Sequence, residues 1–167
     1  MRAVHVLFYR PQLDDHWLNH LVTTFNPPFS HCDIQFDDEV ASSIYQNETV
    51  YMCKKSFSRL NYERISFIVS ELEFNAIYDF CERSCKDMVR FDPMGMVGTF
   101  IPFYYLRPAQ RTFCSRYVCE ALQASGRAEF EHLSPARTTP SHLYSVLSGQ
   151  NKSFIHVGQK RLMTLKG

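Results

Sequence analysis

The chain has 167 residues, of which 45% are hydrophobic and 14% aromatic, and its formal net charge is +1 at pH 7. This composition excludes a disordered or collagen-like chain, and the length predicts one domain, residues 1–167, with a sizeable core. The near-neutral charge gives no electrostatic reason to expect nucleic acid, and no apolar run is long enough for a transmembrane segment.

The first half of the chain predicts one helix among several strands. Residues 2–9 are strand-like, and residues 12–25 carry apolar side chains at helical spacing, which places Trp17 in the core. Short β-type runs separated by turn residues follow, and they cover residues 29–36, 39–46, 49–55 and 62–69. Residues 1–10 are too short and too interrupted for a signal peptide, so we expect an intracellular, cytoplasmic protein whose six cysteines are free thiols.

The second half predicts helices around one irregular stretch. Ser70 and Glu73 have the spacing of a capping box, which opens a long helix with a buried stripe from Leu72 to Met88. Residues 91–111 are rich in Gly, Pro and aromatic residues and predict an irregular loop. In that loop, the aromatic pair Tyr104 and Tyr105 is more typical of packing than of a cleft.

A further helix is predicted to begin near Cys114, two residues after a candidate N-cap at Thr112, and to stop at Ser125-Gly126. Orphan backbone N–H groups and the helix dipole favour a thiolate at such a position, and the same N–H groups can hold an oxyanion. The alternative is that Cys114 fills a helix–sheet contact as an inert, buried residue. A short helix is predicted at 139–147 and a last β run at 153–165. This element order indicates an α+β fold.

A thiolate needs a base, and strand alternation offers one in His31. Within residues 29–36, His31, Asp33 and Gln35 share one face, and Cys32 lies on the other, apolar face. We expect the polar face to point to water or a cleft, where it could bring the imidazole towards Cys114. The alternative is an ordinary histidine on a solvated strand face.

Two motifs in this order resemble the circularly permuted NlpC/P60 superfamily, a papain-like group that includes lecithin:retinol acyltransferase-like proteins and small viral and bacterial relatives. The motifs are FSHCDIQF at residues 29–36 and FCSRYV at 113–118. A third segment, TPSHLYSVL at 139–147, is similar to the segment that often follows the cysteine helix in that group. The resemblance therefore covers residues 29–147, most of the chain.

The resemblance implies Cys114 as the nucleophile and His31 as the base. The third member of the site would lie on the next strand, at Ser42 or Ser43, where relatives often have His, Glu, Asn or Gln. A serine lacks the charge that stabilises an imidazolium, and Asp33 is an alternative orienting residue. The departure from the family pattern at this position leaves turnover open.

Our leading hypothesis is a thiol hydrolase or acyltransferase that acts on an amide, ester or thioester bond without a metal or organic cofactor. The substrate would be a peptide, acyl or lipid group, since relatives of the superfamily act on wall peptides or on fatty acyl groups. The rival hypothesis is a non-catalytic binding or structural protein that keeps the fold. A metal or redox role of Cys81 and Cys85 is a weaker alternative, because no Cys/His set has zinc spacing.

Overall fold

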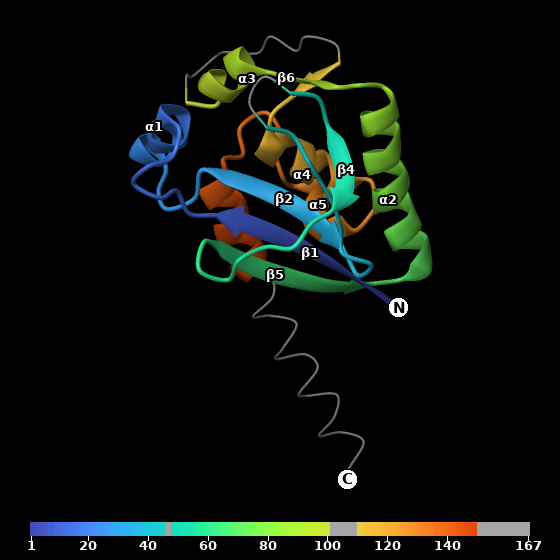
Figure 1. The fold of residues 1–167 in the computed structure, drawn as a ribbon. Helices are drawn as coiled ribbons and strands as arrows, with labels where there is room; N and C mark the ends of the chain where they lie inside the picture. The colour runs from blue at the N-terminus through green and yellow to red at the C-terminus, as the bar shows by residue number, and fades with distance from the viewer. Residues whose placement is uncertain (46–47, 101–109, 150–167) are drawn as a thin grey trace.

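A computed structural model describes residues 1–45, 48–100 and 110–149 of the chain (Figure 1). Its centre is a five-stranded antiparallel sheet with the order β4-β3-β2-β1-β5. The strands are β1 (Arg2–Tyr9), β2 (His31–Phe36), β3 (Val40–Ser43), β4 (Tyr51–Lys54) and β5 (Tyr62–Val69). The predicted strands 2–9, 29–36, 39–46, 49–55 and 62–69 therefore all contain a strand, and the expected α+β class is confirmed.

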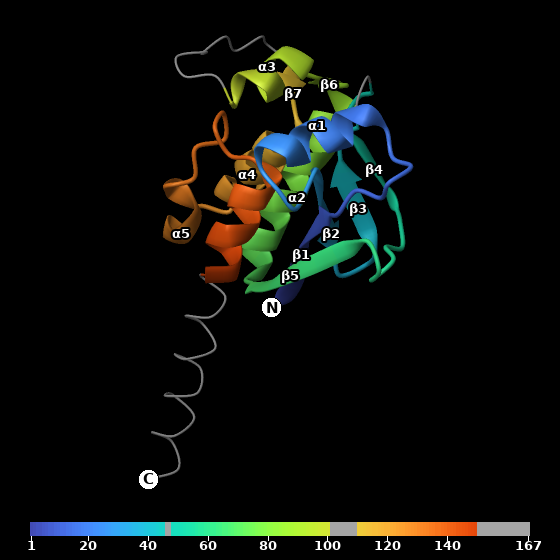
Figure 2. The same ribbon diagram turned by 90° about the vertical axis from the view of Figure 1, so that its left-hand side faces the viewer.

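The helices are α1 (Trp17–Phe25), α2 (Glu71–Lys86), α3 (Pro93–Gly98), α4 (Cys114–Gln123) and α5 (Ala128–Glu131), and residues 140–149 are also helical. Figures 1 and 2 show α2 and α4 together on one side of the sheet, while α1 lies at its end. A separate pair of short parallel strands, β6 (Arg90–Phe91) and β7 (Arg111–Thr112), leads the chain into α4.

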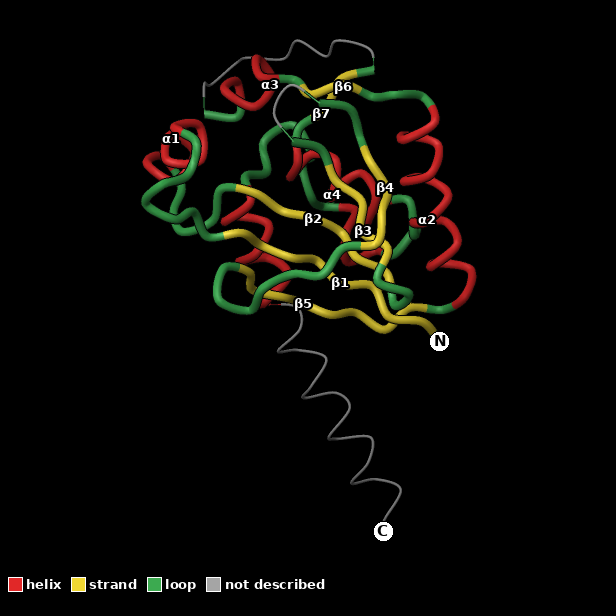
Figure 3. Tube along the Cα trace, in the orientation of Figure 1, coloured by secondary structure: helices red, strands yellow, loops and turns green. Residues whose placement is uncertain are grey.

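The core lies between the sheet and these helices. Val4, Val6 and Phe8 alternate along β1 with side chains that face away from the helices, and all three are fully buried. In the register of the sheet Phe8 lies opposite Cys32, so the apolar face of β2 joins the same core. Helix α4 packs directly on β2, which brings the two motifs together (Figure 3).

The predicted capping box at the start of α2 is confirmed. The Glu73 backbone N–H donates to Ser70 Oγ at 3.3 Å, and the Ser70 N–H donates to Glu73 Oε2 at 2.7 Å. The predicted buried stripe is wrong at both ends, since Leu72 is 80% and Met88 60% exposed. Phe74 is buried instead, because the sheet meets the opposite side of the first turn.

Two further expectations for helices differ from the structure. Trp17 is 62% exposed, because α1 covers only the end of the sheet and buries Val22 alone. Helix α3 interrupts the loop predicted at 91–111, with Asp92 as its N-cap. Gly126, with a φ of 71°, turns the chain after α4. Tyr104, Tyr105 and the β run predicted at 153–165 lie outside the described residues.

Candidate functional site

His31 is the first residue of β2, and its side chain lies on the sheet face opposite the apolar core. The sequence predicted that this face points to water or a cleft. All six residues of β2 are buried, with His31 7% and Asp33 0% exposed, and His31 lines a cavity. The cover comes from Tyr45 and Tyr51. The rings of His31 and Tyr45 stack with centroids 4.5 Å apart, and the Tyr45 and Tyr51 rings are parallel to within 2°.

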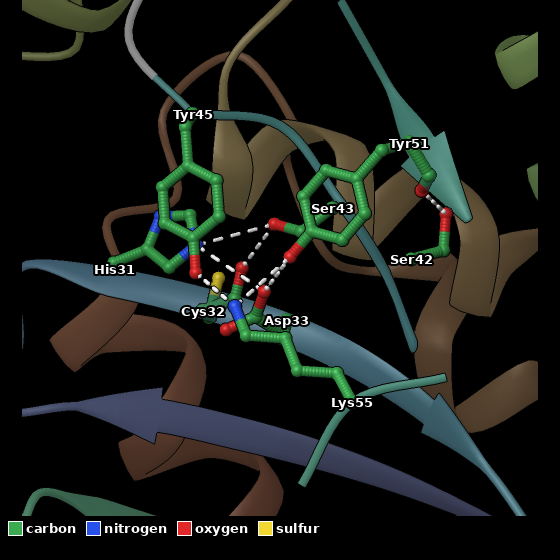
Figure 4. A network of polar contacts seen from close by, with 8 residues as sticks. All are labelled: His31, Cys32, Asp33, Ser42, Ser43, Tyr45, Tyr51 and Lys55. Atoms are coloured by element: carbon green, nitrogen blue, oxygen red, sulfur yellow. Dashed lines mark hydrogen bonds and ion pairs between the residues drawn. The ribbon is translucent and has the colours of Figure 1, made fainter. Parts of the chain in front are cut away.

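The Nε2 atom of His31 faces two polar partners (Figure 4). Asp33 Oδ1 lies 3.4 Å away on the same strand, and Ser43 Oγ lies 3.3 Å away on β3. Ser43 Oγ also donates to the Cys32 carbonyl at 3.0 Å, which fixes the hydroxyl beside the ring. Asp33 and Ser43 together hold the orientation of the ring.

Ser42 does not take part in this cluster. Neighbouring residues of a strand point to opposite faces, and the side chain of Ser42 lies on the core side. Its hydroxyl is 2.6 Å from the Tyr117 hydroxyl and donates to the Tyr51 carbonyl at 2.9 Å. Of the two serines predicted for the third position, the structure therefore brings only Ser43 to His31.

Asp33 is held by a second layer of side chains that sequence reasoning missed. The Tyr51 hydroxyl donates to Asp33 Oδ1 at 2.8 Å, and Lys55 Nζ donates to the hydroxyls of Tyr45 and Tyr51. Burial opposes a charged carboxylate, but the charge and hydrogen bond of His31, the charge of Lys55 and the Tyr51 bond lower the pKa of Asp33 below its ordinary value. Asp33 is therefore an anion in a buried environment.

Cys114 is the first residue of α4, as predicted, and its side chain is 6% exposed. The N-cap is Phe113 rather than Thr112, and it supplies no side-chain hydrogen bond. The first backbone N–H groups of a helix have no partner within the helix. An uncapped start leaves those of α4 free to stabilise negative charge beside the sulfur.

His31 and Cys114 shift each other's pKa in opposite directions. The pKa of the Cys114 thiol lies well below its ordinary value, because hydrogen bonding from the Cys32 thiol, then the charge and hydrogen bond of His31, outweigh the effect of burial. Burial alone would lower the pKa of His31, but the Asp33 and Cys114 charges and their hydrogen bonds raise it well above the ordinary value. The pair therefore favours a thiolate and an imidazolium.

Two further helix cysteines, Cys81 and Cys119, differ from Cys114. Burial raises the pKa of both Cys81 and Cys119 to about 12, which keeps them as neutral thiols. All six cysteines are free, and Cys53 is the exposed one among them. Within the described residues, no group of three or more His, Cys, Asp or Glu side chains is arranged to hold a metal ion.

Two small cavities meet at Cys114. One of about 180 Å³ contains His31, Cys114 and an apolar wall from α1 and α3, including Leu18, Val22 and Met96. A narrower one lies between Phe113, Pro140 and the same Val22 and Met96. A larger cavity of about 540 Å³ lies across the outer sheet face, lined by Lys55 and Arg64 among others, and contains neither His31 nor Cys114. We place the candidate site at the small cavities because the perturbed ionisable groups converge there.

No family model matches the sequence, and comparisons with curated proteins and with solved structures found no match. In the part of the chain that the structure describes, no helix has the length and apolar character needed to cross a membrane.

Proposed function

We propose that the protein is a cysteine-dependent acyl-transfer enzyme, a hydrolase or acyltransferase, of the permuted NlpC/P60 type. The observation that carries the proposal is the pairing of Cys114 with His31, in which the thiol pKa is lowered and the imidazole pKa raised. Two further observations support this type. The histidine strand precedes the cysteine helix in the chain, and α4 packs on β2.

In this mechanism the Cys114 thiolate attacks the carbonyl carbon of an ester, thioester or amide. The N–H groups at the start of α4 stabilise the tetrahedral oxyanion, and the His31 imidazolium donates its proton to the leaving group. Neutral His31 then removes a proton from water or a second nucleophile, which releases the acyl group. Asp33 orients the ring and stabilises its charged form, a task for which Ser43 alone lacks the charge.

The lining of the cavity favours an apolar acyl group. Leu18, Val22, Ile44, Phe91 and Met96 surround the space in front of the sulfur. Its volume of about 180 Å³ is below the roughly 300–1,000 Å³ of typical ligand pockets, so a short or narrow chain fits better than a bulky glycopeptide.

Alkylation of the purified protein tests the activated thiol on which the proposal rests, and acyl transfer from p-nitrophenyl butyrate tests catalysis. Iodoacetamide should label Cys114 at pH 6, where an ordinary thiol of pKa about 8.5 is mostly protonated. The His31→Ala variant should lose this low-pH reactivity, while Cys119→Ala serves as the matched control from the same helix. Peptide mass spectrometry identifies the labelled cysteine. Equal and slow labelling of all buried cysteines would contradict the proposal.

One observation favours a non-catalytic binding protein as the second candidate. Both Cys114 and His31 are more than nine-tenths buried, so a substrate reaches them only through the small cavities. This alternative predicts low-pH alkylation by iodoacetamide without any transfer of an acyl group from p-nitrophenyl butyrate.

A further inference from the structure

Ser30, the residue before β2, carries a buried hydroxyl beside the candidate site. Its side chain is 5% exposed, and Oγ is buried without a hydrogen bond to any described residue. The backbone of Ser30 is fixed, since its N–H donates to the Tyr9 carbonyl at 3.1 Å. A buried hydroxyl without a partner costs free energy, and such groups are rare enough in folded proteins to require an explanation.

The position of Ser30 provides an explanation for its buried hydroxyl. The two cavities that meet at the nucleophile share four lining residues, which are Val22, Ser30, Met96 and Cys114. Val22 and Met96 are apolar, so among the described residues that line both cavities Ser30 contributes the one polar side chain besides the thiol. Ser30 therefore borders the space that the carbonyl of a bound substrate would enter, and its hydroxyl has no competing hydrogen-bond partner among the described residues.

We propose that the Ser30 hydroxyl donates a hydrogen bond to the carbonyl oxygen of the acyl substrate and stabilises the oxyanion that forms there. It acts together with the N–H groups at the start of α4, where the N-cap residue Phe113 supplies no side-chain hydrogen bond. The inference rests on the proposed acyl transfer at Cys114. Ser30 is then a catalytic residue whose unsatisfied hydroxyl is a stability cost retained for transition-state stabilisation.

The test follows the first half-reaction of the full-length protein with p-nitrophenyl butyrate. The Cys114 Sγ–carbon bond forms, the carbon–oxygen bond to the leaving group breaks, and p-nitrophenolate is released with the acyl group left as a thioester on Cys114. Stopped-flow absorbance gives the rate, and mass spectrometry locates the acyl group. Ser30→Ala should slow this step on the order of 100-fold, the typical effect of removing an oxyanion donor. Ser30→Thr, which keeps the hydroxyl, should recover most of the rate.

Two readouts separate this role from a structural one. Iodoacetamide reacts by displacement at a saturated carbon and forms no oxyanion, so its rate with Cys114 should change by less than about twofold in Ser30→Ala. The melting temperature of Ser30→Ala should be equal to or above that of the wild type, because no hydrogen bond is lost. Ser42→Ala is the matched comparison: it removes a buried serine hydroxyl that is bonded, and it should lower the melting temperature.

Each outcome decides the inference. An acylation rate of Ser30→Ala within about threefold of the wild type overturns it while leaving acyl transfer at Cys114 intact. A lower melting temperature with equal losses in acylation and alkylation also overturns it, as it indicates a structural role. A wild-type protein that alkylates at low pH but never forms the thioester refutes the proposed function, and the role of Ser30 with it.

Discussion

The two faces of β2 are equally buried but chemically opposite. On the core face, Cys32, Ile34 and Phe36 pack against helices in an apolar environment. On the other face, His31 and Asp33 carry opposite charges under a cover of tyrosine rings. The comparison shows that a strand pattern fixes which residues share a face but not how much water reaches them. Here the side chains of the second face are buried as well, and this burial strengthens the interactions between its charges.

The charges on the polar face form a series of neighbouring side chains in which the sign alternates. Lys55 lies behind Asp33, Asp33 beside His31, and His31 beside Cys114, so each ionised group has an opposite neighbour. Buried charges are tolerated only when they are paired and hydrogen-bonded. We therefore infer that the thiolate depends on the whole series, whereas stability depends mainly on the apolar face.

The largest expected effect on stability comes from the apolar face. Phe36 is 1% exposed and packs against the Phe74 and Tyr78 rings at centroid distances of 5.3 and 4.8 Å. Phe36→Ala should lower the free energy of unfolding by about 3–5 kcal/mol because it leaves a cavity. Urea denaturation measures this change. The pH dependence of Cys114 alkylation should stay as in the wild type at a temperature where the variant is folded; a shifted profile would show that the two faces are not independent.

The substitution Asp33→Asn tests the role of charge on the polar face of β2. It keeps the shape of the side chain but removes the charge that raises the pKa of His31. The imidazolium is then less favoured, the pKa of Cys114 rises, and alkylation at pH 6 should slow on the order of tenfold, since an adjacent opposite charge shifts a pKa by about 1–3 units. Asp14→Asn, at an exposed position, is the control and should leave the rate unchanged.

The same variant tests the pH dependence of stability. The folded pKa of Asp33 is lower than its unfolded value of about 3.9, so its contribution is present above that value and is lost as the pH falls through the folded pKa. The folded pKa of His31 is raised, so its contribution is present below about 6.5 and is lost as the pH rises through the folded pKa. The free energy of unfolding, measured by denaturation at a series of pH values between about 3 and 9, should therefore change less with pH at both ends of this range for Asp33→Asn than for the wild type. The same pH dependence of the unfolding free energy in both proteins would contradict the ion pair between His31 and Asp33.

How much the sequence predicts differs between these two faces. Alternation identified the core residues of β2, and the helix-start motif identified Cys114, because both depend on local patterns. The choice between Ser42 and Ser43 needed the register of β3, which no local pattern contains. Tyr45, Tyr51 and Lys55 were missed because they lie in or beside other strands and come near His31 and Asp33 only through tertiary packing. Trp17 shows the converse, since an apolar residue at helical spacing was assigned to a core that does not reach it.

Two tyrosine hydroxyls allow a matched test of the difference between the two faces of the sheet. Tyr51 donates to the charged Asp33 at 2.8 Å, whereas the Tyr117 hydroxyl shares a 2.6 Å bond with the neutral Ser42. Tyr51→Phe should cost about 1.5–3 kcal/mol of unfolding free energy, and Tyr117→Phe about 0.5–1.5 kcal/mol, because bonds to charged groups are stronger. Only Tyr51→Phe should also slow alkylation at pH 6, as it raises the pKa of Asp33. Equal costs with no kinetic difference would mean that Asp33 is not ionised.

The smallest expected effect belongs to Lys55, at the outer end of the charge series. Its ammonium group lies 4.7 Å from the centroid of the Tyr45 ring and 4.9 Å from that of Phe57, and its charge lowers the pKa of Asp33. Because the side chain is only half-buried, solvent screens this charge more than that of His31. Lys55→Met should therefore cost about 0.5–1 kcal/mol of unfolding free energy and slow alkylation at pH 6 by less than Asp33→Asn does. Lys54→Met, one residue earlier and exposed, should do neither. An effect of Lys55→Met as large as that of Asp33→Asn would show that the lysine, and not the histidine, is the main partner of the buried carboxylate.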